Sequence, residues 1–218
     1  MRNLRTIKLL YFKESSVLKK LNFLLVIVLL SGCNSDANAT NQKEYFFSPI
    51  GWKFHLPDYW LPQKGSNIEK TLEKYGDKLR IDDAQMEKFR NQQVFMMETS
   101  SGFNKFTSEV SSFSGSELEF ENGIATYKNQ LMSQLKGISP EVEINVGEVN
   151  EISIDGQKFS VFETKFKFVK SKNDYFYMQV YMGNVNSNIL LASYTCIHGS
   201  SECKTVKQAF ESSTFKKI

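Results

Sequence analysis

Residues 142–168, VEINVGEVNEISIDGQKFSVFETKFKF, decide the fold of this chain. Apolar and polar residues alternate over Val142–Val146 and again toward Ile154, which is the pattern of half-buried strands. Asp155 and Gly156 follow directly, and this dipeptide is the strongest hairpin signal in the sequence. The stretch therefore predicts consecutive antiparallel strands that turn at Asp155 and Gly156.

The strand after this turn changes its phase. Phe159 and Val161 share one phase, whereas Phe162, Thr164, Phe166 and Phe168 share the other. An extra residue inserted into a strand shifts the alternation of its side chains by one position. We therefore predict a β-bulge near Phe162.

Two more strands and a closing helix are expected after this stretch. Residues 175–182 and 188–196 alternate as a strand pair, joined by a connection over residues 183–187. Residues 204–215 have the spacing of an amphipathic helix. Its expected inward side chains are Val206, Ala209, Phe210 and Phe215.

Strand and helix patterns are mixed in the first part of the chain. Trp52–Pro57, residues 93–99 and residues 103–113 have strand patterns, and the polarity of the last fits an edge strand or a long loop. Two short helices are expected over residues 66–79 and 82–90, and a long one over residues 117–136. The whole order predicts one α+β domain, with an antiparallel sheet flanked by helices.

Two short motifs resemble the PsbP-like (Mog-type) family. Residues 48–57, SPIGWKFHLP, followed by Tyr59 and Trp60, are similar to the opening segment of that family. Residues 210–215, FESSTF, are similar to its closing helix and tail. The resemblance implies an α+β sandwich over residues 45–218. It carries no catalytic residues, and a shared fold does not establish a function.

A short apolar segment, LNFLLVIVLLSGC, occupies residues 21–33 and follows Lys19 and Lys20. A basic region, a short apolar run and small residues before a cleavage point make up a secretory signal. The run is shorter than the ~20 apolar residues that a membrane-spanning helix needs. Its last four residues, Leu-Ser-Gly-Cys, resemble the lipobox of bacterial lipoproteins, in which the cysteine is acylated and the chain is cut just before it.

This resemblance implies that Cys33 is lipidated. We expect residues 1–32 to be the signal peptide, residues 33–44 the lipidated cysteine with a flexible tether, and residues 45–218 the folded domain. In Gram-negative lipoproteins an aspartate after the cysteine commonly retains the protein in the inner membrane, and Asn34 stands at that place here. The expected location is the cell envelope, anchored in the outer membrane and facing the periplasm.

The charge of the mature chain excludes one class of partner. Six of the 27 basic side chains and one of the 24 acidic ones precede Cys33, so the mature part carries 21 basic and 23 acidic residues. Nucleic-acid-binding domains instead carry a basic patch. We therefore expect no nucleic-acid partner.

Cys196 and Cys203 remain as a pair once Cys33 is assigned to the lipid. Paired cysteines of an exported protein are usually bridged, which predicts a disulfide between them. The alternative is a metal site that includes His198, but zinc prefers four ligands and His55 is the only other histidine. We expect no metal and no cofactor.

The sequence contains no catalytic constellation. Nucleophilic catalysis needs a serine or cysteine beside a histidine, and there is no G-x-S-x-G motif. Ser116 is interpreted as a helix N-cap, and Glu117, Glu119 and Glu121 as a solvated first helical turn. His55 is expected on a solvated strand face and His198 in an exposed loop. We therefore predict that the chain is not an enzyme.

The only candidate binding site is a tyrosine stripe. Tyr175, Tyr177 and Tyr181 share one face of a strand, because side chains alternate along it. If that face is exposed, tyrosines suit an interface; the alternative is that the opposite face of the strand forms the core and the tyrosine face is partly covered. The leading interpretation is a lipid-anchored envelope protein with a non-enzymatic binding or accessory domain. The alternatives are a periplasmic immunity protein that neutralises a delivered toxin and, third, an envelope hydrolase.

Overall fold

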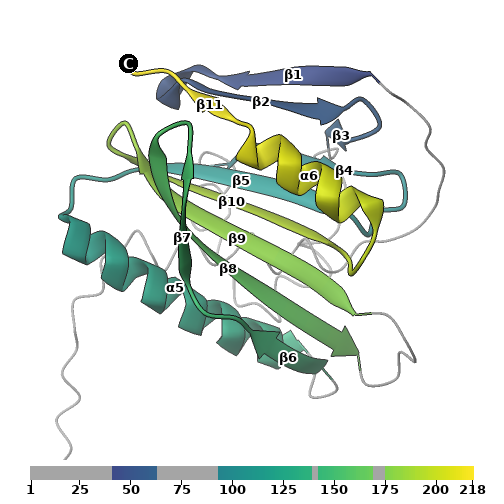
Figure 1. Ribbon diagram of the computed structural model, residues 1–218. Helices are drawn as coiled ribbons and strands as arrows, with labels where there is room; N and C mark the ends of the chain where they lie inside the picture. The colour runs from purple at the N-terminus through teal and green to yellow at the C-terminus, as the bar shows by residue number, and fades with distance from the viewer. Residues whose placement is uncertain (1–40, 63–92, 139–141, 169–174) are drawn as a thin grey trace, which may run out of the picture.

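The computed structural model describes residues 41–62, 93–138, 142–168 and 175–218 (Figure 1). The expected signal, the lipobox and the two short helices over residues 66–79 and 82–90 lie outside these ranges. The first described strand begins at Gln42, within the last residues of the expected tether. No helix in the described part of the chain is long and apolar enough to cross a membrane.

Eight strands form one antiparallel sheet. The strand order is β3-β4-β5-β10-β9-β8-β6, and β7 pairs with the first half of β8. The strands are β3 (Leu61–Pro62), β4 (Gln93–Glu98), β5 (Lys105–Ser112), β6 (Val142–Val146), β7 (Asn150–Ile154), β8 (Gln157–Phe168), β9 (Phe176–Val185) and β10 (Asn188–Ile197).

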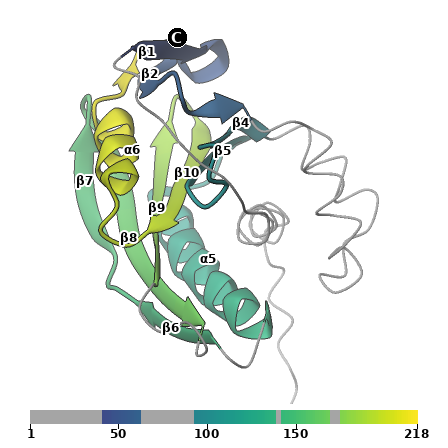
Figure 2. The same ribbon diagram turned by 90° about the vertical axis from the view of Figure 1, so that its right-hand side faces the viewer.

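The two faces of this sheet are covered by different elements (Figures 1 and 2). One face packs against α5 (Glu117–Ile138), and the other against α6 (Ser201–Glu211) and a small second sheet. The small sheet has the order β1-β2-β11, with β1 (Gln42–Phe47), β2 (Trp52–Pro57) and β11 (Thr214–Phe215); the 3-10 turn Ser48–Ile50 joins β1 to β2. The predicted α+β fold with an antiparallel sheet flanked by helices is confirmed.

Each face of the large sheet has its own hydrophobic core. The core beneath α6 and the small sheet includes Trp52, Phe54, Phe106, Phe159, Tyr181 and Phe210. The core beneath α5 includes Phe120, Tyr127, Leu131, Phe162, Met178 and Val180. Because side chains alternate along a strand, the central strands contribute to both cores.

The bulge predicted near Phe162 is wrong. β8 pairs with β9 from Phe159 to Phe166 without a shift of register. Phe159 and Val161 enter the core beneath α6, whereas Phe162 and Phe166 enter the core beneath α5. The phase changes because β8 is buried on opposite faces at its two ends. The irregularity lies in the neighbouring strands, where residues 147–149 between β6 and β7 face only two residues of β8.

The edge-strand or loop interpretation of residues 103–113 is also wrong. β5 lies inside the sheet between β4 and β10. Lys105, Thr107, Glu109 and Ser111, on one face of the strand, are all buried. Alternating polar residues usually mark the solvent side of a strand, and this made the pattern of β5 misleading.

The C-terminal helix is shorter than predicted and begins earlier. Ser200 caps the N-terminus of α6, where its Oγ accepts a hydrogen bond from the Cys203 amide at 3.4 Å. After Glu211 the chain forms β11, so Phe215 reaches the core from a strand opposite Trp52 and not from a helix.

The predicted hairpin at Asp155 and Gly156 is confirmed. Both residues have positive φ, 48° and 75°, as a tight hairpin turn requires. The second turn is at Asn186 and Ser187, so Gly183, expected in the connection, lies within β9. A Cβ at Gly183 would lie 2.6 Å from the Phe159 ring, which explains why this strand position holds glycine.

Candidate functional site

The predicted tyrosine stripe lies on the α6-facing side of β9, but its members differ in exposure. Tyr181 is fully buried, and its ring centroid lies 4.5 Å from that of Phe210 in α6. Its hydroxyl donates a hydrogen bond to Glu211 Oε1 at 3.0 Å. The inclusion of Tyr181 in the candidate binding site is therefore wrong, because α6 covers this residue. Tyr175 and Tyr177 remain partly exposed.

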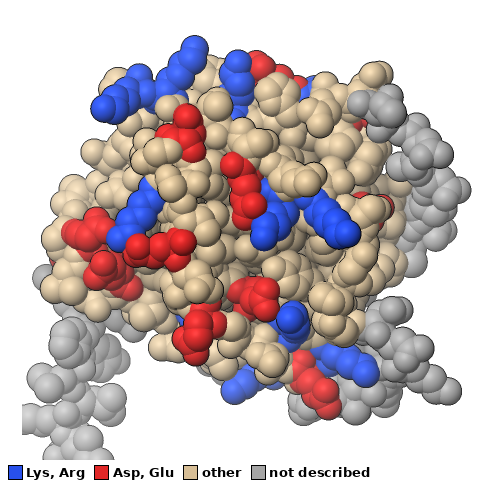
Figure 3. Space-filling view, in the orientation of Figure 1, with Lys and Arg blue, Asp and Glu red and all other residues tan. Residues whose placement is uncertain are grey.

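On this side of the sheet, an area at the ends of β6, β8 and β9 lies beyond the N-terminal end of α6 and is not covered by any other described element (Figure 1). We call it the open face and define it by Glu143, Asn145, Glu163, Lys165, Lys167, Tyr175 and Tyr177, with His198 from the loop after β10. All of these residues are partly or fully exposed. Basic and acidic side chains are interspersed over the molecular surface on this side (Figure 3).

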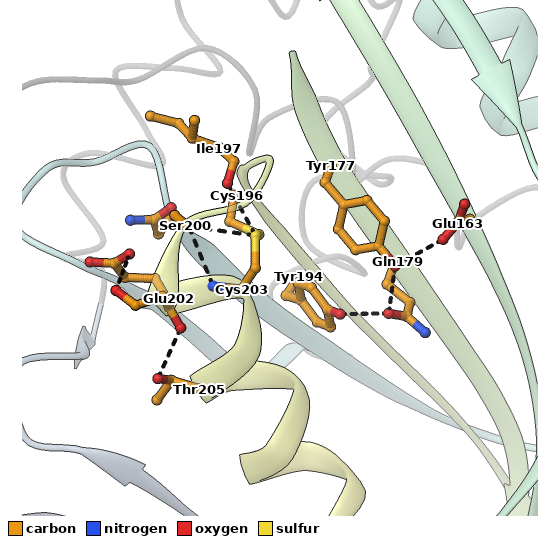
Figure 4. Close-up of a disulfide and its surroundings, with 12 residues drawn as sticks. Glu163, Tyr177, Gln179, Tyr194, Cys196, Ile197, Ser200, Glu202, Cys203 and Thr205 are labelled. Atoms are coloured by element: carbon orange, nitrogen blue, oxygen red, sulfur yellow. Dashed lines mark hydrogen bonds between the residues drawn. A yellow bond between two sulfur atoms is a disulfide. The ribbon is translucent and has the colours of Figure 1, made fainter. Parts of the chain in front are cut away.

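Tyr177 stands at the boundary between the open face and the core (Figure 4). Its hydroxyl lies 3.1 Å from Glu163 Oε2 and 2.9 Å from Gln179 Oε1, so its single proton can serve either acceptor. The buried hydroxyl of Tyr194 also donates to Gln179. Partial burial, and then the charge of Glu163, raise the pKa of Tyr177 to about 12. The phenol therefore stays protonated at neutral pH and acts as a hydrogen-bond donor.

Tyr175 is stacked on His198. Their ring centroids are 4.2 Å apart with an interplanar angle of 22°. The His198 amide donates to the Tyr175 carbonyl at 3.0 Å, which fixes the loop after β10 against the start of β9. The prediction that His198 is exposed is confirmed, and the stack adds it to the stripe. Alternation within one strand gave no signal for this contact, because His198 lies on a different segment.

The predicted disulfide joins Cys196 at the end of β10 to Cys203 in the first turn of α6 (Figure 4). The two Cα atoms are 5.7 Å apart, and seven positions separate the residues in sequence. The bridge closes the loop that carries His198. Cysteines in this bridge are not available as thiolate ligands, which argues against the alternative of a metal site with His198.

We expect the bridge to stabilise the domain by about 2.5 kcal/mol, the loop-closure entropy of so short a loop. Urea unfolding of the protein with and without a reductant measures this difference, and reduction removes no atom from the core. A Cys196→Ala/Cys203→Ala variant should show a similar loss. An unchanged free energy of unfolding after complete reduction would contradict the prediction.

Two hollows lie near these residues. One, of about 410 Å³, separates the ends of β1 and β2 from α6 and is lined by Gln42, His55, Pro57, Thr205, Gln208, Ala209, Glu211 and Ser212. The other, of about 280 Å³, lies at the open face and is lined by Glu143, Ile144, Asn145, Lys165, Phe166, Lys167 and Tyr175. Of these two hollows, the second has a tyrosine of the predicted stripe, Tyr175, in its lining.

The other candidate residues do not form a reactive site. His55 is exposed and lies 3.3 Å from Glu44, on a different element from His198. Within the described residues, no three side chains of the metal-ligating types come together. Ser116 caps α5 as predicted, with its Oγ accepting from the Glu119 amide at 3.3 Å. Glu117 and Glu121 are exposed on the same helix.

A buried carboxyl group was missed from the sequence. Glu109 of β5 is only 2% exposed, and its Oε1 has no hydrogen-bond partner. Burial raises the pKa of this carboxyl well above its ordinary value. At a pH between the ordinary and the raised pKa, the folded state therefore keeps a proton on Glu109 that the unfolded chain releases. Stability contributed by this group therefore falls as the pH rises above the ordinary carboxyl pKa. Its place in an alternating polar strand made it look solvated.

Comparison with solved structures identifies the architecture. The solution structure of CyanoP, the cyanobacterial PsbP of Synechocystis sp. PCC 6803, aligns with a TM-score of 0.51 and 11% sequence identity. The alignment covers 86% of this chain and 99% of that one. The chain has the PsbP-like fold. The two motifs that resemble the family meet in the small sheet, where Phe215 pairs with Trp52 and the Lys216 amide donates to the Gly51 carbonyl at 3.0 Å.

A second similarity is weaker. The crystal structure of the Ran-binding protein Mog1p of Saccharomyces cerevisiae aligns with a TM-score of 0.43 and 9% identity, over 79% of this chain and 92% of that one. No protein-family model and no curated protein sequence matches the chain. At these identities the similarity concerns the fold and not the function.

Proposed function

We propose that this chain is a lipid-anchored protein of the bacterial cell envelope that binds a protein partner through the open face. The observation that carries the proposal is the partial or full exposure of Tyr175, Tyr177 and His198 beyond the N-terminal end of α6. Tyrosine is enriched at protein interfaces, since it offers apolar area together with a hydroxyl group. Because Tyr175 is stacked on His198, little side-chain freedom is lost when a partner covers it.

The anchor follows from the resemblance of residues 30–33 to a lipobox. An acyl group on Cys33 would hold the domain at a membrane surface through the residues that precede β1. Asn34 supports placement in the outer membrane, facing the periplasm. This arrangement raises the local concentration of the domain toward envelope partners and requires no catalytic group.

Acylation of Cys33 is directly testable. Cells grown with a labelled fatty acid should incorporate label into the wild-type protein and none into Cys33→Ser. The variant should remain uncleaved or appear in the soluble fraction, because cleavage of lipoprotein signals follows acylation. Equal labelling of the two proteins would contradict the lipidation of Cys33.

The open face can be tested by photo-crosslinking in intact cells. Benzoylphenylalanine placed at Tyr175 should give a discrete adduct with an envelope protein. The same group at Leu118, which is 65% exposed on α5 at the opposite side of the sheet, serves as the matched control and should give none. Mass spectrometry of the adduct identifies the partner, and thereby separates an accessory role from inhibition of a toxin. Adducts of equal yield at both positions, or at neither, would overturn the proposal.

A further inference from the structure

The hollow of about 280 Å³ at the open face has an unusual set of polar groups. Lys165 and Lys167 have the same phase in β8 and therefore point to the same side of the sheet as Tyr175 and Tyr177. Asn145 pairs with Lys165 across the strands, and Glu143 pairs with Lys167. The lining thus carries two ammonium groups, one amide and one phenol against a single carboxylate.

The two lysines differ in their counter-ions. Lys165 Nζ lies 3.3 Å from Glu163 Oε1, and the other oxygen of Glu163 accepts from Tyr177. Lys167 has no carboxylate within 4 Å among the described residues, although Glu143 is its neighbour across the strands. Lys167 is therefore the group of this hollow whose charge is available to a ligand, and Tyr175 lines the same space.

We propose that this hollow binds a carboxylate side chain of an acidic peptide segment, with Lys167 as its counter-ion and Tyr175 as a hydrogen-bond donor. The Tyr175–His198 stack then forms an apolar wall for the neighbouring peptide residues. The proposal deepens the proposed function, on which it rests, because it names the chemistry of the partner at the open face.

The local charges favour an acidic peptide over an anionic membrane surface. Recognition of anionic lipids by charge usually needs a cluster of four to eight basic residues. Here Glu143 and Glu163 flank the two lysines, and both signs are mixed over this side of the molecule (Figure 3). Glu143 and Glu163 offset the charges of the two lysines, so the cluster that a lipid surface needs is missing, whereas Lys167 can still pair with one carboxylate of a peptide.

The test is an NMR titration of the full domain with N-acetyl-tetraglutamate amide at low salt. The amide signals of Lys165, Lys167 and Tyr175 should shift saturably, and N-acetyl-tetraglutamine amide should leave them unchanged. Lys167→Met should weaken binding about fivefold, the effect of one partly exposed ion pair. Lys158→Met is the matched control: it removes the same charge from the same strand, but its ammonium pairs with Glu151 and Glu117 on the other side of the sheet. It should change the affinity less than twofold.

Each alternative result has a definite meaning. Absence of saturable shifts, or equal effects of Lys167→Met and Lys158→Met, would overturn the acidic-peptide site. Binding to phosphatidylglycerol vesicles that depends on Lys167, without binding of tetraglutamate, would overturn it in favour of a lipid surface. If Tyr175 gives a crosslink but tetraglutamate does not bind, the proposed function stands and this inference fails. If tetraglutamate binds but no crosslink forms, the pocket stands and the proposed function fails.

Discussion

Replacement of Trp52 by alanine is expected to lower the free energy of unfolding by about 3–5 kcal/mol. Trp52 is fully buried, and it is the centre of an aromatic cluster that joins the small sheet to the large one and to α6. Its ring lies 4.7 Å from that of Phe54, 5.4 Å from that of Phe95 and 5.8 Å from that of Phe210. The indole Nε1 donates to Ser213 Oγ at 3.0 Å. The substitution removes these contacts together and leaves a cavity where three elements meet.

Urea denaturation followed by circular dichroism measures this loss. Trp52→Phe keeps part of the ring volume and should cost less. Phe46→Ala, in the neighbouring strand β1, is the control for loss of an aromatic ring from the same small sheet: Phe46 is 52% exposed and should change stability little. If Trp52→Ala costs no more than Phe46→Ala, the small sheet is not packed on the large one as described.

The strand that contains Trp52 could be predicted from the local alternation of apolar and polar residues. The alternation of Trp52, Phe54 and Leu56 with polar residues gave the strand, its inward face and its end at Pro57, and all three are confirmed. This worked because β2 belongs to a sheet with one buried and one solvated face. Local periodicity then reports burial directly.

The same reasoning failed where a strand is covered on both faces. In β8 the two cores take residues of opposite phase, and this looked like an inserted residue. In β5 the polar phase of Lys105 and Glu109 is buried, and this looked like an edge. Both errors have one physical cause: the layers that cover a strand come from other elements of the chain, and the strand's own pattern carries no information about them. The pairing of β11 with β2 has the same origin, since 161 positions separate Trp52 from Ser213.

For the same reason, the sequence predicted which residues of the candidate site share a face, but not which of them are exposed. The shared face of the three tyrosines follows from alternation alone. How much of that face remains exposed depends on where α6 begins, because the open face lies beside the N-terminal end of this helix; α6 begins at Ser201, earlier than its sequence pattern indicated. The contribution of His198 depends on the disulfide, which fixes its loop at the end of β10.

Tyr181 lies in the core and Tyr177 at the edge of the open face, so their replacement should change the stability of the domain by different amounts. Tyr181→Ala is expected to lower the free energy of unfolding by about 3–5 kcal/mol, because it empties a fully buried site against Phe210 and removes the donor to Glu211. Tyr177→Ala should cost only about 1 kcal/mol, since the side chain is partly exposed and its acceptor Glu163 keeps its ion pair with Lys165.

The effects on partner binding should have the opposite order: a change at Tyr177 should weaken binding more than a change at Tyr181. This contrast distinguishes a role in binding from a role in stability. Tyr177→Ala should reduce the yield of the crosslink from Tyr175 while the domain remains folded, because truncation of an interface tyrosine commonly weakens binding by a large factor. Tyr181→Phe keeps the buried ring and should leave the crosslink intact, at a cost of about 1 kcal/mol for the lost hydrogen bond. Thermal melts and crosslink yields of the same three variants decide the question. If Tyr177→Ala destabilises the domain as much as Tyr181→Ala does, Tyr177 belongs to the core, and the open face loses the residue that connects it to the stripe.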